Sequence, residues 1–203
     1  MDECCDFRSD IPERQRRVLT IVLWINAVMF VVEFVAGLAS HSTALLADSV
    51  DMLGDAIVYG FSLCVIGRGT AWQARAALLK GGIMAAFGAG VLAEVGVKIA
   101  RGLVPAADVM TGIGALAFAA NASVLVFLWR RRGDDINMRS AWVCSRNDVI
   151  ANASVLVAAV GVAVTGSAWP DIGVGLAIAA MFASSAVTVI RDARRRLSQL
   201  AAG

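Results

Sequence analysis

The sequence predicts an all-α membrane protein with six transmembrane helices and both termini in the cytoplasm. Of its 203 residues, 59% are hydrophobic and 17% are charged, whereas soluble domains average about 25% charged residues. The apolar residues form blocks of roughly 20 or more, the length at which a helix crosses about 30 Å of hydrocarbon. The alternation of apolar and polar residues that is typical of barrel strands is absent, so we expect helices.

Six such blocks follow one another, at residues 18–40, 43–66, 77–100, 109–129, 141–165 and 170–190. The segment before the first block is long and mixed in charge, and no small-residue cleavage site follows that block, so we do not expect a cleaved signal peptide. The loops are too short for a second domain. We therefore expect one membrane domain at 18–190, an N-terminal cytoplasmic tail at 1–17 and a short basic cytoplasmic tail at 191–203.

The basic residues divide unevenly between the two sides of these blocks. Fifteen lie on the side of the N-terminus: Arg8, Arg14, Arg16, Arg17, Arg68, Arg75, Lys80, Arg130, Arg131, Arg132, Arg139, Arg191, Arg194, Arg195 and Arg196. Only Lys98 and Arg101 lie on the other side. The positive-inside rule places the richer side in the cytoplasm, and both termini share a side only if the number of spans is even. The protein is expected to be multi-pass in the cell (inner) membrane.

The second block carries three aspartates, Asp48, Asp51 and Asp55, in eight positions. Spacings of three and four place them along one stripe of a helix. A carboxylate at the centre of the bilayer costs at least about 2.5–3.5 kcal/mol, so protonation, a basic partner, water or a cation must compensate it. Asp51 and Asp55 are the stronger candidates for a cation site. Asp48 lies nearer the outer end, where it either faces water, caps the helix or supports the site.

The fifth block repeats this period with Cys144 and Asp148, and Asn152 continues the stripe. Two donors on each of two helices can converge on one ion, and four is the number that zinc prefers. A thiolate admits zinc and softer ions such as cadmium, and it disfavours magnesium and calcium. Taken alone, Cys144 is more readily a small buried hydrophobe, but its spacing to Asp148 favours a ligand.

Two further ionisable groups have plainer interpretations. Arg146 lies about 200° around the helix from Cys144, so it cannot share the stripe of Cys144 and Asp148. We slightly favour a side chain that extends to the cytoplasmic headgroups over one that pairs with an acid on a neighbouring helix. His41, the sole histidine, lies in the outer turn between the first two blocks and is expected to be solvated.

The remaining polar residues within the blocks are Asn26, Glu33, Glu94 and Asn121. Hydrogen bonds between helices account for the asparagines, which can also support the site. Asn26 and Glu33 are seven apart and share a face, and we expect Glu33 and Glu94 near the outer ends, in contact with water. The glycines, alanines and serines of the last block favour close packing of helices.

Several classes of function find no support. The sequence has no glycine-rich phosphate loop, no Ser/His/Asp set and no HExxH motif, which argues against an ATP-driven pump and a protease. We expect no enzyme, no bound cofactor and no nucleic-acid partner.

The residues then resemble a known family, the cation diffusion facilitators, which are six-helix metal transporters. The resemblance rests on "VVEFVAGLASHSTALLADSVDMLGDA", on Asn121 with the basic loop after it, and on "MRSAWVCSRNDVIANASV". In that family a pair spaced by four on the second helix joins a similar pair on the fifth. The matching residues here are Asp51, Asp55, Cys144 and Asp148. The resemblance implies export of zinc or related divalent ions in exchange for protons, by alternating access, usually by a homodimer.

The chain departs from the family pattern in three ways. Cys144 stands where the family generally has His or Asp, which shifts the expected preference toward softer ions. The chain ends soon after the sixth block, without the family's cytoplasmic C-terminal domain, and its loop "RRRGDDIN" lacks a histidine-rich insert. At the other end, Cys4 and Cys5 either capture metal for export or belong to an end without such a role.

The resulting prediction is proton-coupled efflux of divalent transition-metal cations from the cytoplasm, with zinc, cadmium or another soft ion as substrate. Two alternatives stay open at this point. One is a membrane metal sensor or partner subunit that binds the ion without moving it, and the other is a proton-driven exporter of organic cations.

Overall fold

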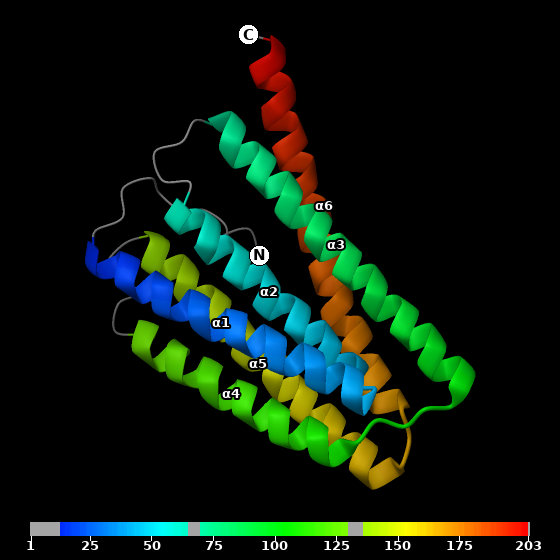
Figure 1. Ribbon diagram of the computed structural model, residues 1–203. Helices are drawn as coiled ribbons and strands as arrows, with labels where there is room; N and C mark the ends of the chain where they lie inside the picture. The colour runs from blue at the N-terminus through cyan, green and yellow to red at the C-terminus, as the bar shows by residue number, and fades with distance from the viewer. Residues whose placement is uncertain (1–12, 65–69, 130–135, 203) are drawn as a thin grey trace.

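The computed structural model describes residues 13–64, 70–129 and 136–202 (Figure 1). Within these ranges the chain is helical, with no strands. The elements are α1 (Glu13–Ser40), α2 (Thr43–Cys64), α3 (Thr70–Arg101), α4 (Ala107–Trp129), α5 (Ile136–Thr165) and α6 (Trp169–Ala202). Each predicted block corresponds to one helix. The all-α class is therefore confirmed.

Several helices extend beyond the apolar blocks. α1 begins at Glu13, inside the expected N-terminal tail, and α6 continues to Ala202, through most of the expected basic tail. The added segments are rich in Ala, Leu, Arg and Gln, which have high helix propensity, so the backbone stays helical after the apolar block has ended. The segment 191–202 is thus a continuation of α6.

Five of the six helices are long and apolar enough to cross a membrane: α1, α3, α4, α5 and α6. Their most apolar segments are only 22–33% buried against the rest of the protein. On α1, for example, Trp24, Val28 and Val31 are all more than half exposed. Such large apolar outer faces fit a lipid environment. The protein is therefore a multi-pass membrane protein.

α2 differs from the other five helices in its charge. Asp48, Asp51 and Asp55 fall within every 18-residue stretch of this 22-residue helix. α2 packs against α1, α3, α5 and α6, and each residue from Ser42 to Val50 is buried. Neighbouring helices therefore separate most of the N-terminal half of α2 from the surroundings.

The helices form two groups. α1, α2, α4 and α5 run side by side as a bundle, and α3 and α6 form a pair that leans away from it toward one end (Figure 1). α2 contacts α1 and α5 in the bundle and both members of the pair, and α5 also packs against α6. The turns after α1, α3 and α5 lie together at one end, opposite the start of α1 and the end of α6 (Figure 1).

The turn between α1 and α2 is tight and conformationally specific. His41 has a φ of 54°, and the backbone N–H of Ser42 donates to the carbonyl of Gly37 at 2.9 Å. This is the left-handed helix ending that glycine usually provides. Gly37 allows the close approach of α1 to α2, because a Cβ there would lie 2.9 Å from the Leu46 side chain.

The start of α2 is held by a buried ion pair from two other helices. Asp171 on α6 accepts hydrogen bonds from the Ser42 hydroxyl (2.6 Å), the Thr43 N–H (2.8 Å) and the Ala44 N–H (3.1 Å). Lys98 on α3 pairs with the same carboxylate and donates to the Thr43 hydroxyl at 2.8 Å. Both charged side chains are fully buried. Asp171 thus caps α2 from outside the helix and joins three helices.

A glycine makes this junction possible. Gly175 lies one turn after Asp171, and a Cβ at this position would lie 2.8 Å from the Thr43 carbonyl carbon. A larger residue would push α6 away from the start of α2. At Gly175 the small residue therefore serves close packing of helices, as predicted.

The two partners of this ion pair are expected to differ in their contribution to stability. Asp171→Leu removes the cap of α2 and leaves a buried ammonium without a counter-ion, so we expect a loss of about 3–5 kcal/mol. Lys98→Met should destabilise less, because Asp171 keeps three hydrogen bonds. Thermal unfolding of purified protein in detergent measures both. Glu94→Gln, in a half-exposed pair, is the matched control and should change stability by no more than about 1 kcal/mol. Equal losses for the two core variants would contradict the assignment of the cap.

Candidate cation site

Asp48 lies at the centre of the bundle. Its side chain is fully buried, and its Oδ2 accepts a hydrogen bond from Asn152 Nδ2 on α5 at 2.6 Å. Of the three alternatives left open for Asp48, contact with water and capping of α2 are therefore wrong. Ser42 and Asp171 provide the cap, and Asp48 lies on the face of α2 that meets α5.

Asn152 extends this contact into a network across three helices. Its Oδ1 accepts a hydrogen bond from Asn121 Nδ2 on α4 at 2.9 Å. The same Asn121 nitrogen lies 3.6 Å from the sulfur of Met52. The side chains of Asp48, Asn152, Asn121 and Met52 are each at most 1% exposed. The asparagines named as supporting residues thus connect α4 and α5 to the acidic face of α2.

The contact between Asp48 and Asn152 also sets the register of α2 against α5. The two helices pack against each other, and they are antiparallel because three chain reversals separate them. Moving along both from this contact toward the inner end, α2 presents Asp51 and then Asp55, and α5 presents Asp148 and then Cys144. The pair Asp51 and Asp55 on α2 therefore lies alongside the pair Asp148 and Cys144 on α5.

The four predicted ligands differ in burial. Cys144 and Asp148 are 4% and 3% exposed, respectively, whereas Asp51 and Asp55 are half-buried. Among the residues that the structure describes, no three Cys, His, Asp or Glu side chains come together closely enough to hold a metal ion. Binding one ion with all four donors therefore requires side-chain rotation or a closer approach of α2 to α5.

Glu33 is a site residue that the sequence interpretation misplaced. Its side chain is 0% exposed, whereas we expected it to touch water. The charges of Asp48 and Asp51 act on its carboxylate, so it lies beside the acidic face of α2. Depth along the helix was the available signal: Glu33 lies seven residues before the end of α1, or about 10 Å inside at 1.5 Å per residue.

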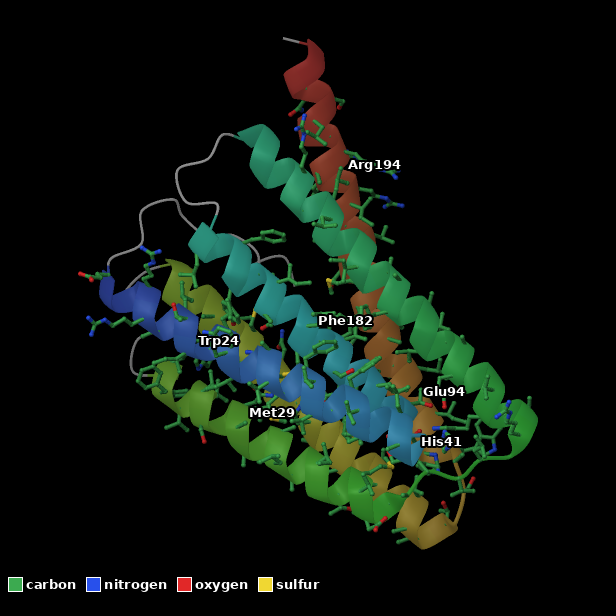
Figure 2. All side chains as sticks on the ribbon, in the orientation of Figure 1. Trp24, Met29, His41, Glu94, Phe182 and Arg194 are labelled. Atoms are coloured by element: carbon green, nitrogen blue, oxygen red, sulfur yellow. The ribbon has the colours of Figure 1, made fainter. Side chains whose placement is uncertain are left out.

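Asn26 lies on the same face of α1 as Glu33 and is 1% exposed. Its Nδ2 donates to the Val22 carbonyl at 2.9 Å, within its own helix, so the expected bond to another helix is not formed by this donor. Met29 lies between the two along α1 and packs with Met52 and Ala117. Figure 2 shows Met29 directed between α1 and α4.

The other ionisable groups lie away from this centre. His41 and Glu94 meet at the end of the molecule that carries the outer turns (Figure 2), with Nδ1 and Oε1 3.5 Å apart and side-chain exposures of 50% and 21%. Both keep contact with the surroundings, as expected. Arg146 is exposed and lies over the ring of Trp142 at 5.5 Å, in agreement with the favoured interpretation.

Lys98 was grouped with Arg101 on the side opposite the N-terminus. The structure shows that its side chain is buried in the pair with Asp171. Cys4 and Cys5 lie outside the described residues, so their role in metal capture stays a prediction.

The groups along α2 and α5 have the chemistry to bind a cation once side-chain rotation or a closer approach of the helices brings them together. They offer carboxylates from both helices and one sulfur donor from α5, within a core that excludes solvent from Asp148 and Cys144. Metal ions bind the deprotonated forms of these groups, so protons compete with the metal for the same atoms. A site of this kind can release its ion when it is protonated.

Asn152 is predicted to be essential for this core. Asn152→Leu removes the donor to Asp48 and the acceptor for Asn121, and each stranded group costs about 1–3 kcal/mol. We expect a clear drop in the unfolding temperature in detergent. Ser154→Ala is the control on the same helix, because Ser154 is partly exposed and donates to the Ile150 carbonyl of its own helix. If the two variants unfold at the same temperature, the network does not stabilise the bundle.

Comparison with known families agrees with this geometry. The family described as "Cation efflux transmembrane domain" matches residues 19–198, a range that includes all six helices in whole or in large part. A comparison with curated protein sequences finds no match. The matched range contains the acidic face of α2, the Cys144 and Asp148 pair and the network that aligns them. The chain therefore belongs to the cation efflux family, the cation diffusion facilitators, whose members transport cations across membranes.

Proposed function

We propose that this protein exports divalent transition-metal cations from the cytoplasm in exchange for protons, with zinc or a softer ion such as cadmium as substrate. The observation that carries the proposal is the register of α2 and α5. Because Asp48 bonds to Asn152 at 2.6 Å, Asp51 and Asp55 run alongside Asp148 and Cys144. Two carboxylates from α2 and a carboxylate and a thiolate from α5 match the four donors that zinc prefers.

The same proposal makes α2 the sixth membrane span. Its three aspartates set it apart from the five helices that are apolar enough along their length, but its N-terminal half is buried among α1, α3, α5 and α6. Six spans place both termini in the cytoplasm under the positive-inside rule. Family membership also supports a homodimer in the inner membrane, with a membrane domain at 18–190.

Proton exchange follows from the chemistry of the donors. In the inward-facing state Asp51, Asp55, Cys144 and Asp148 bind the ion as anions. After the helices rearrange, protons from outside compete for these groups and release the ion. Each state then pairs the buried acids with either a cation or a proton, which avoids the cost of bare carboxylates in the membrane. No enzymatic step and no resident cofactor is part of this cycle.

The direct test is metal flux in proteoliposomes with an imposed pH gradient. We expect zinc or cadmium uptake by the native protein, and loss to background in Asp51→Ala and in Asp148→Ala, because each removes one of four ligands. Asp108→Ala is the matched control, since Asp108 is exposed in the first turn of α4, and it should transport normally. If no flux occurs although metal binds stoichiometrically, the protein is a sensor or partner subunit. Movement of a lipophilic cation instead would support the organic-cation exporter.

Cys144 is predicted to set the preference among ions. Cys144→Ser replaces a soft donor with a hard one, so we expect some zinc transport to persist while the ratio of cadmium to zinc transport falls. Competition between the two ions in the same vesicles measures this ratio. An unchanged ratio would remove Cys144 as the selectivity residue.

A further inference from the structure

Buried carboxylate oxygens without a hydrogen-bond donor gather at one level of the bundle. They are Oε1 and Oε2 of Glu33 and Oδ1 of Asp48, and Oδ1 of Asn121 is a further buried oxygen without a donor. The three side chains are at most 1% exposed. All four atoms are acceptors, so another acceptor cannot satisfy them, whereas a positive charge can.

Glu33 and Asp48 lie at a similar depth on neighbouring antiparallel helices. Glu33 is seven residues before the end of α1, and Asp48 is five residues after the start of α2, or about 10 and 7 Å from these ends. Of the two charges that act on the Glu33 carboxylate, Asp48 has a larger effect than Asp51. Asn121 connects to Asp48 through the shared partner Asn152. The free oxygens therefore belong to one polar centre.

No cation of the described part of the chain is available to this centre. Lys98 is the only buried basic side chain there, and Asp171 holds it at the start of α2. Arg146 is exposed over Trp142. Two fully buried carboxylates without a counter-charge are costly at membrane depth, so either protons or a cation from outside the protein must neutralise them.

We propose that Glu33 and Asp48, with the amide oxygen of Asn121, form a second cation site on the outer side of the predicted transport site. Its donors are all oxygens, so it favours a hard divalent cation such as manganese, magnesium or calcium, with water completing the coordination. It uses neither Cys144 nor Asp148, and it extends the proposed function by adding a separate ion of different chemistry.

The test uses Mn²⁺ and Cd²⁺ as probes on the full chain, purified in detergent. Mn²⁺ binding is followed by its paramagnetic resonance signal, and Cd²⁺ binding by calorimetry. In Glu33→Gln, which keeps the shape of the side chain, we expect Mn²⁺ affinity to fall by about tenfold or more while Cd²⁺ affinity is unchanged. Glu94→Gln, which removes a partly exposed carboxylate from α3, should change neither. Asp148→Ala should weaken Cd²⁺ binding and leave Mn²⁺ bound.

Three results would overturn the second site. The first is that the native protein binds no Mn²⁺ at about 1 mM, the weak end of known oxygen-only sites. The second is an unchanged Mn²⁺ affinity in Glu33→Gln. The third is loss of Mn²⁺ binding in Asp148→Ala. Should Glu33→Gln fail to fold, Glu33→Asp keeps the charge and shortens its reach, and it should weaken Mn²⁺ binding alone. These titrations do not measure flux, so a failure of the proposed transport would appear separately, in the proteoliposomes.

Discussion

The carboxylate of Asp171 is the contact on which the position of α2 depends. It accepts hydrogen bonds from the first N–H groups of α2 and pairs with Lys98 from α3. The N-terminal N–H groups of a buried helix need acceptors, and their partial positive charge attracts an anion. One side chain meets both requirements while joining α2, α3 and α6. It therefore sets where α2 begins in space, and with it the height of each aspartate that follows.

From this starting point the acidic face of α2 falls against α5. Asp48 reaches Asn152, and Asn152 reaches Asn121 on α4, so a single hydrogen-bonded path crosses the bundle. Amides suit this position because they both donate and accept, and so can satisfy a carboxylate and each other in a region without water. The polar network thereby aligns the two pairs of candidate ligands, although each pair lies on a different helix.

The cost of charge within a membrane also explains why α2 is more enclosed than the other helices. α1, α3, α4, α5 and α6 expose apolar surface, and α2 lies among four of them with Asp48 and Ser49 fully covered. Within this core the acids outnumber the buried basic groups of the described chain, since Lys98 is committed to Asp171. A core of this composition is suited to attracting cations, and it agrees with membership of a family that transports them.

The sequence by itself determined the helical class, the six apolar blocks, the four-residue spacing of the candidate ligands and the family. These follow from local periodicity and composition, which depend little on the rest of the chain. Tertiary structure alone decided that Glu33 and Asp48 are buried, that Lys98 pairs with Asp171 across 73 positions, and that α2 and α5 meet in their observed register. Such contacts join residues far apart in the chain. They depend on how whole helices pack, and no spacing within one helix reports that packing.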